Sequence, residues 1–343
     1  MNRKFAFPNC FFEDNAIRLK HTEPERILVN RMPAKLYFAP MEGITTYVYR
    51  NVFARYFGGI DTYFTPFLAN KRFGARERND ILPEHNRGIR VVPQILTNKA
   101  DFFLAIAEQL SAYGYDEVNL NLGCPSGTVV NRRRGAGFLS VPDELDRFLC
   151  EIFAKSPLKI SLKTRIGIRD LSEWDRLLQI YRQYPMTECI IHPRLREEYY
   201  SGTPHAEAFV RAAEVLKVPL CYNGNITDEA GCEAILNRVP NTNAVMIGRG
   251  ALANPELPLR LKGVQTVFDP VRFRAFHDEI LSGYIEEMSG EQPVLFKMKE
   301  LWFHMASYVG ATEEELKKVR KAESLTDYRI AVRALLDPDR EKL

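Results

Sequence analysis

Short runs of apolar, β-forming residues recur along the chain, and stretches with a different hydrophobic spacing separate them. The runs are KLYFAPM (35–41), TYFTPF (62–67), RVVPQIL (90–96), EVNLNLG (117–123), KISLKTRI (159–166), ECIIHPR (188–194), PLCYNG (219–224) and AVMIGRG (244–250). Between them, stretches such as 100–114 and 142–155 place apolar residues at i, i+3 and i+4, the spacing of one helix face. This alternation predicts parallel strands joined by helices.

Eight such units between residues 35 and 250 predict an α/β fold of the (β/α)8 TIM barrel type, whose usual length is about 250 residues. A doubly wound sheet is the alternative, and it usually carries G-x-G-x-x-G after its first strand. Here that position reads APMEGITTYVYR (39–50), without those glycines. We therefore predict the barrel.

From about residue 258 the spacing is helical only, at 271–288, 294–309 and 312–336. We predict an N-terminal extension at 1–33, a catalytic barrel at 34–257 and a smaller all-helical, RNA-binding domain at 258–343. Residues 262–343 hold 13 Lys and Arg against 15 Asp and Glu, so any RNA contact would use one face. Candidate residues are Lys297, Lys299, Lys317, Arg320 and Lys321, and a solvated helix surface explains them equally well.

Composition narrows the class of protein only slightly. A net charge of +3 over 343 residues does not mark the whole chain as a polyanion binder. The six cysteines form no CxxC pair, which predicts reduced thiols and no metal site. Without a signal-peptide pattern or about 18 consecutive uncharged apolar residues, we expect a cytoplasmic protein without membrane contact, and we expect a monomer.

Strand side chains alternate between two faces, so residues two apart share one. This rule predicts that polar side chains near the ends of several strands point into the barrel, where barrel enzymes build their sites. The side chains are Asn119 and Asn121, then Ser161, Lys163 and Arg165, then His192 and Arg194.

A lysine inside a barrel requires an anionic or polar partner, because burying its charge alone is costly. Lys163 therefore predicts a ligand site, although a structural ion pair with a neighbouring strand or the Schiff-base lysine of an aldolase would also explain it. The turns after strands 7 and 8, NGNI (223–226) and IGRGALANP (247–255), contain glycines and Arg249 and are typical of phosphate sites in barrels.

Seven motifs occur in a characteristic order: APMEGIT (39–45), PQIL (93–96), NLNLGCPSGTVVNRRRGAGFL (119–139), LKTRIG (162–167), IIHPR (190–194), YNGNI (222–226) and MIGRGAL (246–252). Across about residues 35–255 the chain thereby resembles the tRNA-dihydrouridine synthases. The resemblance implies an oxidoreductase of CH–CH bonds that reduces uridine in tRNA to 5,6-dihydrouridine, with FMN as cofactor and NADPH or NADH as reductant.

The resemblance also implies roles for particular residues. Reduced FMN would give hydride to C6 of the uracil, Cys124 would give the proton to C5, and Asn121 and Arg165 would face the base. The residues around FMN would be Pro40, Met41, Glu42, Gln94, Lys163 and His192, with Asn223, Gly224, Asn225, Gly248 and Arg249 at its phosphate.

A proton donor must stay protonated near neutral pH, and an ordinary thiol with a pKa of about 8.5 does so. Arg132, Arg133 and Arg134 would lower that pKa if they lay beside the sulfur, so we expect them to point away from Cys124. We interpret them as contacts to RNA phosphates, or else as a solvated loop, and the nearby glycines suggest a movable lid.

Two departures from the family pattern leave the target nucleotide open. The first motif continues with Thr46 and Tyr49-Arg50 where Asp and Phe-Arg are common, and the sixth strand has HPRL (192–195) where HGRT is common. The alternatives are another FMN barrel acting on a small molecule, similar to dihydroorotate dehydrogenase, and an RNA-binding module without activity.

Overall fold

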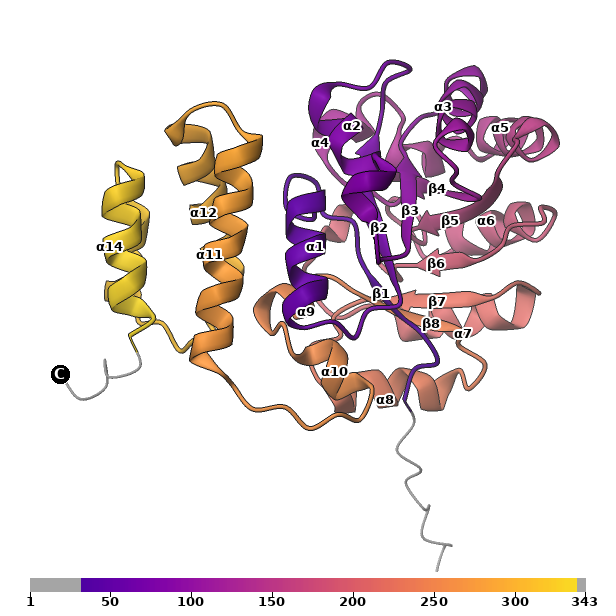
Figure 1. Ribbon diagram of the computed structural model, residues 1–343. Helices are drawn as coiled ribbons and strands as arrows, with labels where there is room; N and C mark the ends of the chain where they lie inside the picture. Colours follow the sequence, from indigo (N-terminus) through magenta and orange to yellow (C-terminus); the bar gives the residue numbers. More distant parts are fainter. Residues whose placement is uncertain (1–31, 338–343) are drawn as a thin grey trace, which may run out of the picture. The chain divides into compact units, whose positions relative to one another are not determined.

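The computed structural model of the protein describes residues 32–337, and in it eight parallel strands close into a barrel in sequence order. The predicted fold is confirmed, with helices between the strands and a helical region after the last one (Figure 1). The strands are β1 Leu36–Phe38, β2 Thr62–Leu68, β3 Val91–Ile95, β4 Glu117–Leu122, β5 Lys159–Thr164, β6 Cys189–Ile191, β7 Leu220–Asn223 and β8 Ala244–Ile247.

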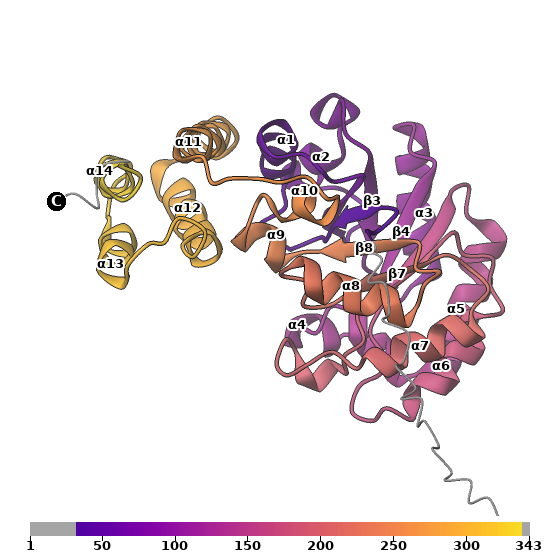
Figure 2. The same cartoon turned by 90° about the horizontal axis from the view of Figure 1, so that it is seen from below.

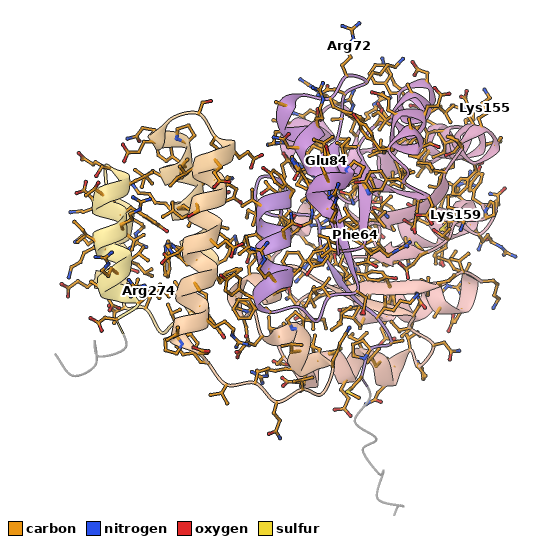
Figure 3. All side chains as sticks on the ribbon, in the orientation of Figure 1. Phe64, Arg72, Glu84, Lys155, Lys159 and Arg274 are labelled. Carbon is orange, nitrogen blue, oxygen red and sulfur yellow. The ribbon has the colours of Figure 1, made fainter. Side chains whose placement is uncertain are left out.

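Two separate apolar clusters hold the barrel together. Side chains on the outer strand face pack against the surrounding helices in the large core, whereas a smaller cluster fills the lower barrel interior. The interior cluster consists of Tyr37, Ala39, Phe64, Val92, Ile190, Cys221, Ala244 and Met246. Figure 3 shows Phe64 among the strands, whereas the exposed Arg72 and Lys155 extend from the surface, and Glu84, Lys159 and Arg274 are also labelled.

Helices and short turns of 3-10 helix connect the strands. They are α1 Tyr47–Tyr56, α2 Ala75–Ile81, η1 Pro83–Asn86, α3 Ala100–Ala112, α4 Gly127–Val130, η2 Gly135–Ser140, α5 Pro142–Lys155, α6 Glu173–Tyr181, η3 Arg196–Glu198, α7 Ala206–Val215, α8 Glu229–Arg238, α9 Arg249–Ala253 and α10 Leu257–Leu261. The boundary that we place at 257/258 thus falls at the start of α10, and the domain limits stay a prediction.

The C-terminal region contains α11 Pro270–Glu287, α12 Glu291–Met305, α13 Glu313–Lys321 and α14 Leu325–Leu335. Figure 2 shows α11 beside α14 and α12 beside α13. The stretch 312–336, which we treated as one helical pattern, is two helices. Ala322 ends the first, and the Ser324 side chain accepts a hydrogen bond from the Asp327 backbone N–H to start the second.

An aromatic cluster joins the helical region to the barrel. The ring of Phe276, on α11, is fully buried and makes edge contacts with four rings of the α1 segment, at centroid distances from 5.0 to 6.4 Å. These rings are Tyr49, Phe53, Tyr56 and Phe57. Edge-to-face contacts add to the area that such rings bury, so this cluster fixes α11 against α1.

The N-terminal extension lies outside the described residues, apart from Met32 and Pro33. Among residues 32–337, no helix is long and apolar enough to cross a membrane. Within the same part of the chain, no group of three or more His, Cys, Asp or Glu side chains is arranged to hold a metal ion.

Replacing Phe276 with alanine should lower the free energy of unfolding by about 3–5 kcal/mol, because the change leaves a cavity among the rings of α1. Denaturant unfolding measures this loss. Ile330→Ala is the matched control, since that side chain is 66% exposed and its removal should change stability by less than about 0.5 kcal/mol. Equal stability of the two variants would contradict the anchoring role of Phe276.

Candidate active site

One cavity of about 780 Å³ lies at the C-terminal ends of the barrel strands. Every residue that we predict around FMN lines it, and so do Asn121, Cys124 and Arg165. These residues come from the ends of all the strands except β2, which contributes Pro66 and Phe67 instead. The structure therefore brings together side chains that are up to about two hundred positions apart in the sequence.

A row of amide side chains crosses three neighbouring strands below this cavity. Asn121 donates to the Gln94 Oε1 at 2.7 Å, and Gln94 donates to the Asn119 Oδ1 at 2.8 Å. Asn119 in turn donates to the Ser161 Oγ at 3.0 Å. Gln94 and Asn119 each donate and accept within the row, and the Asn121 oxygen accepts from backbone N–H groups, so the orientation of all three amides is fixed.

Asn121 also shapes the turn that carries the cysteine. Its Oδ1 accepts hydrogen bonds from the backbone N–H groups of Gly123, at 3.0 Å, and Cys124, at 2.9 Å. On the other side of the turn, Gly135 has a φ of +55°, and a Cβ at this position would lie 2.9 Å from the Cys124 carbonyl oxygen. Gly135 therefore permits close packing against Cys124, and the movable lid that we expect from the glycines of this segment stays a prediction.

The Cys124 thiol is partly buried and forms no disulfide among the described cysteines. Burial raises the pKa of Cys124 above its ordinary value, more than the nearby positive charges of Arg165 and Lys163 lower it. The thiol is therefore neutral near pH 7. This protonation state suits a proton donor and does not suit a nucleophile, which requires a thiolate.

Lys163 lies one strand away, directly opposite Asn121 in the register of β4 and β5. Its Nζ donates to the Asn223 Oδ1 at 2.8 Å, and no carboxylate among residues 32–337 forms an ion pair with it. The structural ion pair that we considered for Lys163 is thus absent from this part of the chain. Burial, reinforced by the charge of Arg165, lowers the pKa of Lys163 to about 8, so the ammonium form still predominates at pH 7.

His192 is held in one protonation state and one tautomer. Burial lowers the pKa of His192 well below its ordinary value, and the surrounding cations lower it further, so the ring is neutral. Its Nε2 lies 2.8 Å from the Nη1 of Arg194, a group that can only donate. Nε2 therefore accepts, and the ring proton resides on Nδ1.

Two buried arginines hold the segment that follows β6. Arg165 donates to the carbonyl oxygens of Leu195 and Tyr199, at 2.9 and 2.6 Å, and also to that of Gly123. Arg194 donates to the carbonyls of Ser201 and Gly202. Three of the N–H groups of Arg165 are thus engaged with backbone, so the side chain joins two loops besides lining the cavity.

Tyr200 is a residue of the cavity wall that the sequence reasoning missed. Its ring is 52% exposed and lies beneath two guanidinium groups, those of Arg249 at 4.8 Å and Arg165 at 5.4 Å from the ring centroid. The His192 ring is 6.1 Å away. The adjacent tyrosines at 199 and 200 were visible in the sequence, but only the folded loop shows which of them faces the cavity.

His304 was also missed, since its helical spacing suggested a packing or surface residue. It belongs to α12, in the helical region, yet it lines the cavity together with Arg249 and Ala253 of the barrel. Burial lowers its pKa, which keeps the ring neutral. The site is therefore built from both the barrel and the helical region.

The segment after β1, which carries Pro40 to Glu42, is held from three sides. Arg50, fully buried in an ion pair with Asp80 at 3.4 Å, donates to the carbonyl oxygen of Thr45 at 2.7 Å. Lys297 of α12 donates to the carbonyl oxygen of Gly43 at 2.6 Å, and Arg76 forms an ion pair with Glu42. These contacts give the cavity a fixed wall on the β1 side.

The arginine run lies outside the cavity. Arg132, Arg133 and Arg134 follow the short helix α4; the first two are exposed and Arg134 is half-buried, and Arg133 makes a long contact of 3.5 Å with Glu144. None of the three lines the cavity that contains Cys124, and the direction in which they point relative to its sulfur stays a prediction.

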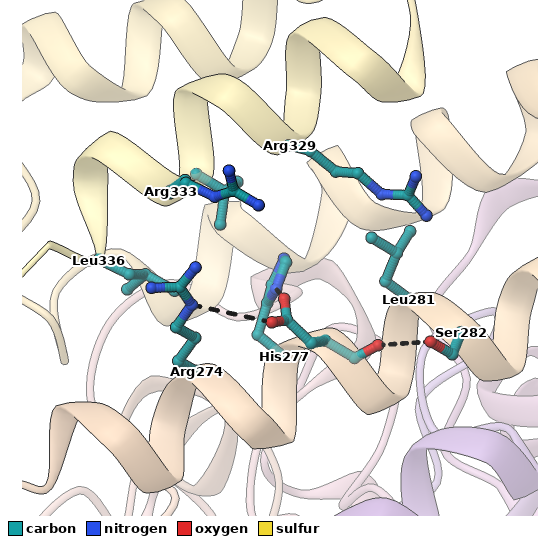
Figure 4. A pocket seen from close by; sticks show the side chains of 9 residues that line it. Arg274, His277, Leu281, Ser282, Arg329, Arg333 and Leu336 are labelled. Atoms are coloured by element: carbon teal, nitrogen blue, oxygen red, sulfur yellow. Dashed lines mark hydrogen bonds and ion pairs between the residues drawn. The ribbon is translucent and has the colours of Figure 1, made fainter.

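A second, smaller cavity of about 160 Å³ lies between α11 and α14 (Figure 4). Arg274, Arg329 and Arg333 surround it, and the buried His277 lies at its base. His277 is hydrogen-bonded on both ring nitrogens, to Asp278 at 2.9 Å and Tyr328 at 2.6 Å. Within residues 32–337, no thiol and no strand end lines this cavity, so it lacks the groups that meet in the cavity at the barrel rim.

A closed parallel barrel with convergent polar groups at its C-terminal rim is the arrangement of a (β/α)8-barrel enzyme. The family model described as dihydrouridine synthase (Dus) matches residues 37–334. The chain therefore belongs to the dihydrouridine synthase family and is an enzyme.

Two relatives show the extent of the likeness. The chain is 31% identical over 244 residues to a tRNA-dihydrouridine(16) synthase of Cupriavidus necator, covering 67% of this chain and 74% of the relative. It is 29% identical over 243 residues to a protein of the same name from Ralstonia nicotianae, covering 67% and 73%. Among solved structures, the match to a histamine dehydrogenase from Rhizobium sp. 4-9 covers 74% of this chain and 49% of the chain of that enzyme. The TM-score is 0.50 and the sequence identity is 11%, so this likeness shows a shared fold.

Alkylation of Cys124 by iodoacetamide should titrate with a midpoint above about 8.5, the ordinary value of a free thiol, because burial disfavours the thiolate. Mass spectrometry of the peptide that contains Cys124, after short exposures across a pH series, measures this midpoint. The same peptide in denaturant is the control and should titrate near the ordinary value. A folded-state midpoint below the denatured one would show that the thiol is not neutral.

Proposed function

We propose that the protein reduces uridine to 5,6-dihydrouridine in tRNA, with FMN as its cofactor and NADPH or NADH as the reductant. Membership of the dihydrouridine synthase family and the names of the two relatives support this reaction. The single observation that carries it is the cavity at the barrel rim, where a neutral thiol and a half-buried ammonium line the same space.

The residues present fit a phosphorylated flavin. A volume of about 780 Å³ lies within the range of cofactor sites. Lys163, Arg165 and Arg249 make the cavity positive, because its carboxylate, Glu42, is already paired with Arg76. Asn225 has a φ of +45° and accepts from Arg249 at 3.0 Å, so the turns after β7 and β8 approach each other beside this charge. We assign the phosphate to Asn223, Gly224, Asn225, Gly248 and Arg249, and the ring and ribityl groups to Pro40, Met41, Glu42, Gln94, Lys163 and His192.

A reduced flavin, when bound in this cavity, would supply the hydride for C6 of the uracil. Cys124 delivers a proton from its Sγ to C5, and the resulting thiolate takes a proton from solvent. The raised pKa of Cys124 keeps the proton on sulfur until negative charge develops on the base. Lys163 and Arg165 stabilise that charge by their own positive charges, and Asn121 holds the turn that positions the sulfur.

The RNA backbone requires contacts outside the cavity. Arg132 and Arg133 are exposed and Arg134 is half-buried in the loop that follows Cys124, where they can neutralise phosphates next to an extruded uridine. The helical region at 258–343 supplies a second contact to the RNA backbone, because His304 of this region lies at the edge of the cavity. Location in the cytoplasm and a monomeric state stay predictions.

The alternatives explain less of the molecule. A small-molecule oxidoreductase similar to dihydroorotate dehydrogenase would not require the arginine run or the helical region. An aldolase would use Lys163 covalently, in conflict with the family of the chain. An RNA-binding module without activity would not require a neutral thiol and a half-buried lysine in one cavity.

The purified protein should be yellow, should release FMN on denaturation, and should form dihydrouridine in an unmodified tRNA pool when NADPH is added. Replacing Cys124 with alanine should keep the flavin absorbance and lower dihydrouridine formation about 10²- to 10⁴-fold, the usual contribution of a general acid. The exposed Cys150 provides the control, and Cys150→Ala should act like the wild type. A colourless protein, or full activity of Cys124→Ala, would reject this proposal.

Changing Arg132, Arg133 and Arg134 together to alanine should weaken tRNA binding and make it less sensitive to salt. Three lost phosphate contacts should reduce the slope of log K against log salt by about 2. Binding measured by fluorescence anisotropy at several salt concentrations gives this slope. The control is Arg169, Arg176 and Arg182 changed to alanine, three exposed arginines on the β5–β6 side of the barrel. An unchanged slope in the first variant would rule out the phosphate role.

A further inference from the structure

Two phenylalanines on α12 lie on the surface of the protein. Phe296 is 66% exposed and Phe303 is 86% exposed, although both are large apolar side chains in a helix whose other face is buried. They are seven positions apart, so they project from the same side of the helix, about 10 Å apart along its axis. We call this pair the α12 aromatic face.

The next residue after each phenylalanine turns toward the barrel. His304 lines the catalytic cavity, and Lys297 donates to the carbonyl oxygen of Gly43 at 2.6 Å. These two contacts fix the rotation of α12 about its axis, since positions 297 and 304 share one face. The aromatic face is therefore continuous with the edge of the cavity.

The charges of α12 and of the neighbouring helix α13 suit an anionic partner that has flat, apolar parts. Glu300 lies between the two rings, and its carboxylate is already paired with Lys297 at 2.8 Å. On α13, which packs against α12, Lys317 and Lys321 are exposed and form no ion pair within residues 32–337. Two rings separated by a charged residue make too small an apolar patch for a stable protein interface.

Unpaired nucleotides have the required chemistry. RNA loops are commonly bound by stacking their bases on aromatic side chains, while lysines nearby contact the phosphates. When a uridine is extruded into the cavity, the bases beside it lose a stacking partner, and an aromatic ring at the cavity edge can replace that partner. A separation of about 10 Å corresponds to about three base steps.

We propose that Phe296 and Phe303 form a stacking surface for the unpaired nucleotides that flank the target uridine. This inference rests on the proposed function, because it takes the uridine to be bound in the cavity. In this inference α12 has two roles: His304 lines the cavity, and the α12 aromatic face binds the bases next to the target uridine.

The test compares Phe296→Ala, Phe303→Ala and the double variant with the wild-type holoenzyme, using unmodified tRNA. Each single change should raise the Kd and the KM for tRNA about 5- to 100-fold, the range that the loss of one stacked base produces. Flavin content and the oxidation of NADPH without RNA should not change. The slope of log K against log salt should also stay the same, because no phosphate contact is lost.

Two controls separate stacking from a general surface effect. Phe303→Tyr keeps a flat ring and should restore binding, whereas Ile330→Ala removes from α14 an apolar side chain that is as exposed as Phe296 and should leave binding unchanged. Wild-type affinity in the double variant would overturn the inference, and so would a change of oligomeric state in sedimentation with unchanged RNA binding. A wild type that binds tRNA but forms no dihydrouridine would contradict the proposed function, whereas the stacking inference is decided by the binding measurements above.

Discussion

Hydrogen bonds between inward-facing side chains of adjacent strands determine the geometry of this site. Gln94 lies between Asn119 and Asn121, so the three amides have a single consistent arrangement of donors and acceptors. The oxygen of Asn121 then fixes the turn that presents Cys124. A polar row inside a barrel is costly unless every member is paired, and here pairing within the row leaves the cavity floor rigid.

The positively charged side chains near the cavity fall into two groups with different roles. Arg165 and Arg194 direct their N–H groups to backbone carbonyls and hold the segment after β6, which carries Tyr200. Lys163 and Arg249 have only amide oxygens as hydrogen-bond partners among the described residues, so their charges are not cancelled by carboxylates. Positive potential in the cavity is therefore available to a ligand, while the structural arginines keep its walls in place.

The eight strands and the polar rim could be predicted because both depend on local rules, the alternation of strand side chains and the closure of βα units. Lys163 and Asn121 were found in this way, since their inward orientation follows from the strand period. Contacts between segments that are far apart in the sequence leave no such periodic pattern in it. The role of Gly135 against Cys124 depends on how a loop folds back, and the break at Ala322 depends on a local cap that competes with a continuous helical pattern.

His304 shows most clearly what sequence periodicity misses. Its position on α12 looks like an ordinary helix surface, and it reaches the cavity only because Phe276 fixes α11 on α1 and Lys297 ties α12 to the β1 loop. Anchoring the helical region in this way has a functional consequence. Under the proposed function, RNA contacts on the helices would act on a wall of the cavity, so binding far from the base would help to position that base.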